Sequence, residues 1–239
     1  MADFYEYADG DVMRFQRELA HYLATFTPGP DNVYVRLIRE LGINRFIFCS
    51  LNYDLLFELS AAMLGHNTAY TSEHSTGFVR LLKPHGSSNF WPYMPGVTIR
   101  NSTIKRSGRA DIQAPIRPLS QMDTLEKCVT EDSVAPAIAM YAEGKPVKIS
   151  PDYVEAQQRM WAESVGRASR ICVVGARIHL PDTHIWTPLT ACSADLFYFG
   201  LESDREAFER WGEVSKKKNA YFVEADFSTA VPMISRRMK

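Results

Sequence analysis

Three short polar segments of the sequence carry residue types suited to acid–base chemistry and to anion binding. They span residues 50–54, 85–88 and 175–182 and offer an amide, a carboxylate, an imidazole and a glycine-containing turn. An imidazole exchanges protons near neutral pH, and an amide holds a water or a carbonyl through paired hydrogen bonds. A glycine turn before a helix presents backbone N–H groups to an anion. The segments therefore predict a site that binds an anionic ligand and moves a proton.

Each polar segment follows a short apolar run typical of a strand buried on both faces, at residues 45–50, 78–82 and 171–174. Further strands are predicted at 196–199 and 221–223. Strands that alternate with helices indicate a mostly parallel sheet, and ligands bind at the carboxyl edge of such sheets. The predicted fold class is α/β, a doubly wound, Rossmann-like parallel sheet that gathers the three segments at one edge.

Helical spacing of apolar residues predicts the helices that position these strands, at residues 12–26, 32–41, 55–63, 151–165, 183–189 and 204–211. Asp31 and Asp182 are placed to cap two of them. Residues 92–149 have a weaker pattern, rich in Pro, Arg, Ser and Gly. We expect this stretch to be an irregular insertion, or a small subdomain, between the halves of a single domain that spans residues 1–239.

The composition narrows the classes of partner. Hydrophobic residues make up 46% of the chain, so a packed globular protein is expected. The net charge of −1 gives no electrostatic reason to expect nucleic acid or an anionic membrane. The start is acidic and aromatic, unlike a signal peptide, and no apolar run is long enough to span a membrane. The cysteines form no Cys-x-x-Cys pair, so we expect no metal and a cytoplasmic setting.

At the polar segments the sequence resembles the sirtuin-like family of NAD-consuming proteins. SLNYD (50–54) is similar to the sirtuin Thr-Gln-Asn-Ile-Asp segment, and closer to the Asn-Tyr-Asp form of bacterial sirtuin-like defence proteins. KPHGS (83–87) resembles the family's His-Gly motif. VVGAR (173–177), with Asp182 downstream, resembles its later Gly-Thr-Ser turn. The resemblance extends over roughly residues 15–234.

The resemblance implies that NAD is the substrate and that its nicotinamide–ribose bond is hydrolysed to nicotinamide and ADP-ribose. It gives Asn52 the role of holding a water or the nicotinamide ribose, and His85 the role of the base. Asp54 would face the nicotinamide pocket, and Asp226 would lie near adenine. The other ligand contacts that it implies are Ser50, Gly86, Gly175, Ala176, Arg177 and Asp182. Hydrolysis of this bond passes through an oxocarbenium-like sugar. It requires a pocket that holds the leaving group and a positioned water with a base nearby.

Two departures from the family's pattern bear on activity. The missing zinc module of the deacylases favours metal-free NAD hydrolysis, in bacterial antiphage defence, over protein deacylation. Nothing before Phe15 resembles the family's first strand and Gly-Ala-Gly diphosphate loop. We therefore expect the isolated chain to be weak or inactive, and a second copy or a partner subunit to cover an exposed sheet edge. The alternative function is a catalytically incomplete module that binds NAD, ADP-ribose or a partner chain.

Each candidate residue also has a purely structural alternative. Asn52 could cap the helix that follows it, and Asp54 could merely complement the dipole of that helix's first turn. His85 could be an ordinary loop histidine. Gly175 could serve only the strand-to-helix turn, and Arg177 could be solvated. These alternatives stay open on the sequence alone.

Overall fold

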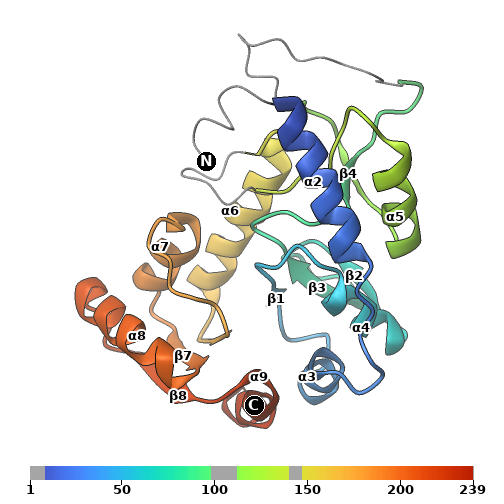
Figure 1. The fold of residues 1–239 in the computed structure, drawn as a ribbon. Coiled ribbons are helices and arrows are strands. Elements are labelled where there is room, and N and C mark those ends of the chain that lie inside the picture. Colours follow the sequence, from blue (N-terminus) through green and yellow to red (C-terminus); the bar gives the residue numbers. More distant parts are fainter. Residues whose placement is uncertain (1–8, 98–111, 140–146, 239) are drawn as a thin grey trace. The chain divides into compact units, whose positions relative to one another are not determined.

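The computed structural model describes residues 9–97, 112–139 and 147–238, which fall into two compact units (Figure 1). Unit 1 comprises Met1–Pro28, Ser50–Leu59 and Lys83–Gln157, and unit 2 comprises Gly29–Cys49, Ser60–Leu82 and Gln158–Lys239. Helices α4 (Leu56–Met63) and α6 (Pro151–Arg167) each begin in unit 1 and end in unit 2. The expectation of a single domain with an insertion stays a prediction.

Unit 2 contains two parallel sheets. One has the strand order β1 (Phe48–Cys49), β3 (Phe78–Leu82), β2 (Asn67–Ala69). The other has the order β6 (Arg170–Val174), β7 (Asp195–Gly200), β8 (Ala220–Glu224). These pairings confirm the α/β class with parallel strands.

The prediction of one continuous Rossmann-like sheet is wrong for the described residues. Along its open side β1 has no strand neighbour among them, because its only pairing is with β3. In the same way β6 pairs only with β7, so no described strand joins the two sheets. Strand β1 is also shorter than the predicted run of 45–50, with ladder pairing at Phe48 and Cys49 alone.

Aromatic packing explains why β7 is the centre of its sheet. Tyr198 and Phe199 on this strand are almost fully buried. Tyr198 stacks on Phe222 of β8 with ring centroids 5.9 Å apart, a cross-strand contact that stabilises the pairing. Helix α8 (Glu202–Ser215) adds Phe208, whose ring lies 5.1 Å from that of Tyr198.

Helices α3 (Val33–Leu41) and α9 (Phe227–Met238) lie side by side in unit 2 (Figure 1). Tyr34 and Phe227 meet edge to face at 5.3 Å, and Arg36 donates a hydrogen bond to Ser228 Oγ. Helix α9 was not expected from the sequence. Helix α7 (Thr183–Ala191) follows Asp182 as predicted, but the Asp182 side chain makes no capping hydrogen bond.

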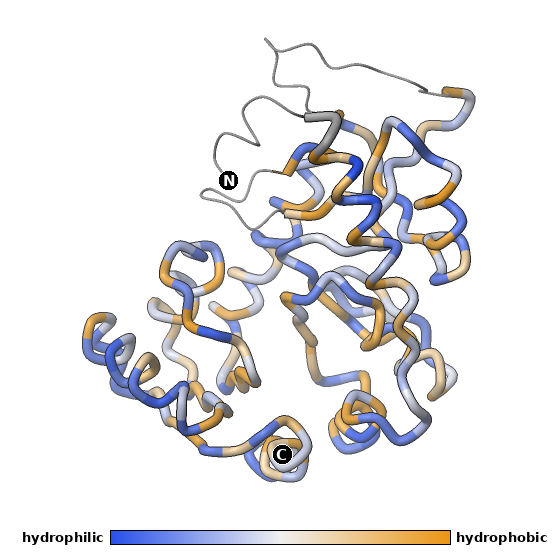
Figure 2. The backbone as a smooth tube through the Cα atoms, in the orientation of Figure 1, coloured by the Kyte–Doolittle hydropathy of each residue, from blue (hydrophilic) through white to orange (hydrophobic). Residues whose placement is uncertain are grey.

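Unit 1 is built on two helices and a hairpin. Helix α2 (Asp9–Ala24) packs beside α5 (Gln121–Thr130), and β4 (Phe90–Pro92) pairs antiparallel with β5 (Ile116–Pro118). Hydrophobic and hydrophilic residues alternate along α2 in Figure 2, as an amphipathic helix requires. Its buried face contributes Val12 and Met13 to the core, where Met13 packs with Ile149.

The prediction that residues 92–149 are irregular missed β5 and α5. Helix α5 could not be predicted from hydrophobic spacing, because Thr124 is its only buried residue and the helix therefore lacks a recognisable apolar stripe. Its start is instead set by Ser120, whose hydroxyl accepts a hydrogen bond from the Asp123 N–H. Residues 98–111 and 140–146 of this stretch lie outside the described residues. None of the described helices combines the length and the apolarity that crossing a membrane requires.

The N-cap of α3 offers a test of the fold. Asn32 is the cap, rather than the predicted Asp31: its Oδ1 accepts from Tyr34 N at 2.9 Å and from Val35 N at 3.2 Å. Asp31 is exposed, and its ion pair with Arg39 is long at 3.7 Å. We expect Asn32→Ala to lower the free energy of unfolding by about 1–2 kcal/mol, and Asp31→Ala by less than about 0.5 kcal/mol. Urea denaturation measures both, and a larger loss for Asp31→Ala would contradict this assignment.

Candidate functional site

A buried lysine fixes the two polar turns of unit 1 to each other. Lys83 directly follows β3, and its side chain is buried. The Nζ atom donates to Asn52 O at 3.1 Å and to Asp54 O at 2.5 Å, and it lies 3.2 Å from Glu58 Oε1. An ammonium group has three N–H donors, and its burial is tolerated when these donors find acceptors. Lys83 therefore holds the turn after β1 in a defined place beside the turn after β3.

The polar residues in the turn at 50–55 have different structural roles. Asp54 Oδ1 accepts from Leu56 N at 3.0 Å, so this carboxylate caps α4. Asn52 lies outside the capping position and is exposed, and its backbone N–H donates to Ser50 Oγ at 3.2 Å. Within the part of the chain that the structure describes, its side-chain amide makes no hydrogen bond. The structure thus gives a local role to Asp54 and none, among the described residues, to the Asn52 amide.

The loop after Lys83 is buried throughout. His85 is 6% exposed, and Ser87 and Ser88 are fully buried. Backbone hydrogen bonds hold this loop on two sides: Ser88 N donates to Tyr53 O at 2.9 Å, and Ala139 N donates to His85 O at 2.8 Å. Tyr53 Oη also donates to Ala139 O. The Asn52 turn, the His85 loop and the strand-like segment around residue 139 thus form one hydrogen-bonded assembly.

The assembly includes residues that the sequence analysis did not select. Lys83 and Tyr53 belong to the predicted motifs, but the sequence predicts no role for either of them. The segment from Val134 to Ala139 lies in the stretch that is predicted to be irregular. Burial of that segment is nearly complete. An apolar run, Val134-Ala135-Pro136-Ala137-Ile138-Ala139, was the available signal for it.

The other predicted residues lie in unit 2, around the carboxyl ends of β6 and β8. Gly175 directly follows β6, and its N–H donates to Phe199 O at 3.1 Å. Ala176 O accepts from Tyr198 Oη at 2.6 Å, whereas Arg177 is exposed. The Gly175 turn is therefore tied to β7, and the Arg177 side chain faces solvent.

Two predicted carboxylates of unit 2 have structural partners. Asp182 is buried, and its Oδ1 lies 3.4 Å from His179 Nδ1. Asp226 Oδ1 accepts from Thr229 N at 2.7 Å, at the start of α9. Hydrogen bonds from Thr229 lower the pKa of Asp226, because they stabilise its ionised form. Asp226, which is expected to lie near adenine, therefore also caps helix α9.

The structure brings together five of the predicted site residues in unit 1, namely Ser50, Asn52, Asp54, His85 and Gly86. It holds the remaining five in unit 2, namely Gly175, Ala176, Arg177, Asp182 and Asp226. The residues expected to act on nicotinamide and those expected to bind the adenosine half thus separate cleanly between the units.

Two of the four cysteine thiols lie in surroundings that raise their pKa. Burial raises the pKa of the Cys172 thiol to about 12 and that of Cys128 to about 11. Neither sulfur is therefore a thiolate nucleophile at neutral pH. Among residues 9–97, 112–139 and 147–238, no group of three or more His, Cys, Asp or Glu side chains is arranged to hold a metal ion.

Comparison with protein-family models, with curated proteins and with solved structures found no match. The resemblance to sirtuin-like proteins at the polar segments therefore stays a prediction.

The role of Lys83 can be tested by a double-mutant cycle with Glu58. Lys83→Met leaves a buried carboxylate and two carbonyls without their donor, so we expect a loss of about 3–5 kcal/mol in the free energy of unfolding. Lys83→Met combined with Glu58→Leu removes both charges and should recover part of that loss. Chemical denaturation of the two single variants and the double variant gives the coupling energy. Strictly additive losses would show that the ion pair does not organise this turn.

Gly86 offers a second test, of the His85 loop. Its φ is +82°, and an added Cβ would come within 2.9 Å of the Ala137 carbonyl carbon and collide with its oxygen. Gly96 has a similar φ of +75° with open space around it. We expect Gly96→Ala to cost about 1 kcal/mol from backbone strain alone and Gly86→Ala more than about 3 kcal/mol. Equal losses of thermal stability in the two variants would refute the close packing of this loop on Ala137.

Proposed function

We propose that this chain is an NAD glycohydrolase that cleaves the nicotinamide–ribose bond, with Asn52 and His85 at the reacting centre. The observation that carries the proposal is the position of the Lys83 side chain. Its Nζ donates hydrogen bonds to Asn52 O and Asp54 O, and Lys83 itself stands two residues before His85 in the chain. This contact supports a shared location for the amide and the imidazole that hydrolysis needs. The resemblance at residues 50–54 and 83–87 supplies the identity of the substrate.

The proposed reaction uses the two side chains differently. Nicotinamide leaves with the electron pair of its bond to ribose, and an oxocarbenium-like sugar remains. The exposed Asn52 amide holds the attacking water or a ribose hydroxyl by paired hydrogen bonds. The water oxygen bonds to the anomeric carbon, and His85 accepts the proton that the water loses. NAD and water thus give ADP-ribose, nicotinamide and a proton.

The remaining predicted contacts are proposed to bind the rest of the NAD molecule. Ser50 and Asp54 are proposed to line the nicotinamide side. Gly86 is proposed to contribute through its backbone, and any side chain at this position would collide with Ala137. In unit 2, Gly175 forms the turn that presents the Ala176 N–H group and the exposed Arg177, which suit the diphosphate or the ribose. Asp182 and Asp226 are proposed to support the adenosine half. Participation in bacterial antiphage defence is proposed from the resemblance alone.

The alternative function is a module that binds NAD, ADP-ribose or a partner chain without hydrolysis. Two observations favour it: Asp54 and Asp226 already serve as helix caps, and no described strand joins β1 to β6. Among the described residues both strands lie at an edge of their sheet, and an edge strand can pair with another chain. We propose that a second copy or a partner subunit covers such an edge, and that full NAD binding depends on it.

The enzyme proposal is tested by nicotinamide release from NAD, with the full chain and with the proteins encoded next to it. His85→Ala and Asn52→Ala should each reduce turnover by about a hundredfold or more, because each removes a group that positions or activates the water. Ser75→Ala, in a loop of unit 2, is the control and should keep full turnover. Circular dichroism verifies that each variant is folded.

The outcomes separate the two functions. Near-native turnover in His85→Ala would overturn the mechanism. An absence of nicotinamide release under every condition, together with calorimetric binding of ADP-ribose that Asn52→Ala weakens, would favour the binding module. Absence of both hydrolysis and binding would overturn both proposals.

A further inference from the structure

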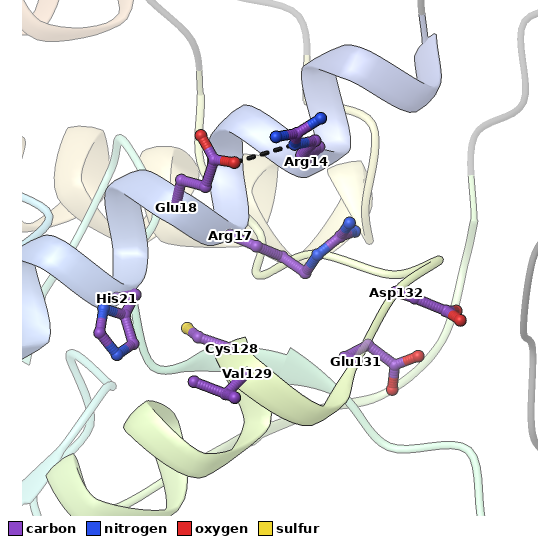
Figure 3. Close-up of a pocket in the computed structure, with 8 residues that line it drawn as sticks. All are labelled: Arg14, Arg17, Glu18, His21, Cys128, Val129, Glu131 and Asp132. Carbon is purple, nitrogen blue, oxygen red and sulfur yellow. Dashed lines mark hydrogen bonds and ion pairs between the residues drawn. The ribbon is translucent and has the colours of Figure 1, made fainter.

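A groove of about 420 Å³ runs between α2 and α5 in unit 1 (Figure 3). The two helices are antiparallel: Gln121 at the start of α5 donates to Ala24 O at the end of α2. Arg17, in the middle of α2, donates to Val134 O just beyond α5. The groove is therefore lined by residues of both helices.

Large apolar side chains stand on the exposed faces of both helices. On α2 they are Phe15 and Tyr22, which are 47% and 60% exposed. On α5 they are Met122 and Val129, each 73% exposed. Each pair is separated by seven residues, or two helical turns, so its members lie on one face of their helix. Single exposed apolar residues are ordinary, but four on two adjacent helices form a surface suited to association.

The two walls of the groove carry opposite charges. The α2 wall presents the guanidinium groups of Arg14 and Arg17, and the wall at the end of α5 presents the carboxylates of Glu131 and Asp132 (Figure 3). Arg14 pairs with Glu18 within α2, and Glu131 pairs with Lys127 within α5. The Arg14–Glu18 pair is an exposed i,i+4 pair of the kind that contributes little and exchanges partners readily, whereas the Glu131 side chain is only 15% exposed.

We propose that this face binds a second copy of the same chain, with a two-fold axis running along the groove. Such an axis sets α2 of one copy antiparallel to α5 of the other, at the same height along the groove. Arg14 then faces Glu131 of the second copy, and the apolar pairs close over the groove. The surface is self-complementary, as an isologous interface must be. The proposal is independent of the proposed function.

The size of the face sets the strength of association to expect. Helix α2 has 16 residues, which gives a length of about 24 Å, and two neighbouring helices are about 20 Å wide. Each copy therefore buries about 500 Å², less than the roughly 800 Å² per partner of a standard interface. A weak dimer with a micromolar dissociation constant is the expected result.

Sedimentation equilibrium of the full chain, from about 1 to about 300 μM, measures this association. Val129→Glu should raise the dissociation constant at least about tenfold, because it buries an unpaired carboxylate in the interface. Val214→Glu, on α8 of unit 2, is the matched control, since Val214 is 74% exposed. It should leave the constant unchanged. Thermal melts establish that both variants fold.

Charge exchange identifies the pairing of the walls. Arg14→Glu and Glu131→Arg should each weaken self-association, whereas an equimolar mixture of the two variants should form a mixed dimer with both contacts restored. A wild-type chain that stays monomeric throughout the range would overturn the proposal. A dimer that Val129→Glu leaves intact, or that Val214→Glu weakens equally, would also overturn it.

Discussion

The Lys83 ammonium is the interaction on which the candidate site of unit 1 depends. Moving an ammonium out of water costs several kcal/mol even after relaxation, so the surrounding chain must supply acceptors in good geometry. Two of those acceptors are main-chain oxygens, at Asn52 and Asp54. The requirement therefore constrains the backbone of the turn, while the Asn52 side chain makes no hydrogen bond to the described residues. Glu58 on the first turns of α4 balances the charge and extends the same constraint into a helix.

Much of the local structure could be predicted from the sequence, because local patterns encode it. The apolar run at Phe78–Leu82 and the helical spacing in α2 were recognisable, and the turns after β1 and β3 were located correctly. Long-range pairing was not available in this way: nothing in the residues of β1 or β6 states which strand lies beside them. Lys83 illustrates the same limit, since a lysine is ordinarily exposed and only tertiary contacts reveal its burial.

The residues proposed for the chemistry are divided between the two units of the chain. The amide and imidazole proposed to act on the labile bond belong to one unit, and the glycine turn proposed for the phosphates belongs to the other. The helix caps at Asp54 and Asp226 add rigidity to both turns, because each carboxylate fixes the start of the helix that follows. These two site residues are thus held at the starts of helices.

The contact of Gln16 with Ile138 O, at 2.9 Å, has a consequence for biosynthesis. Ile138 stands 122 residues after Gln16, so this contact forms only once the later segment has been synthesised. Closing so long a loop is entropically costly, and folds dominated by such distant contacts form slowly. At ordinary elongation rates of about 5–20 residues per second, synthesis of the residues between Gln16 and Ile138 takes several seconds or more. The Gln16 amide therefore stays without this acceptor for that time.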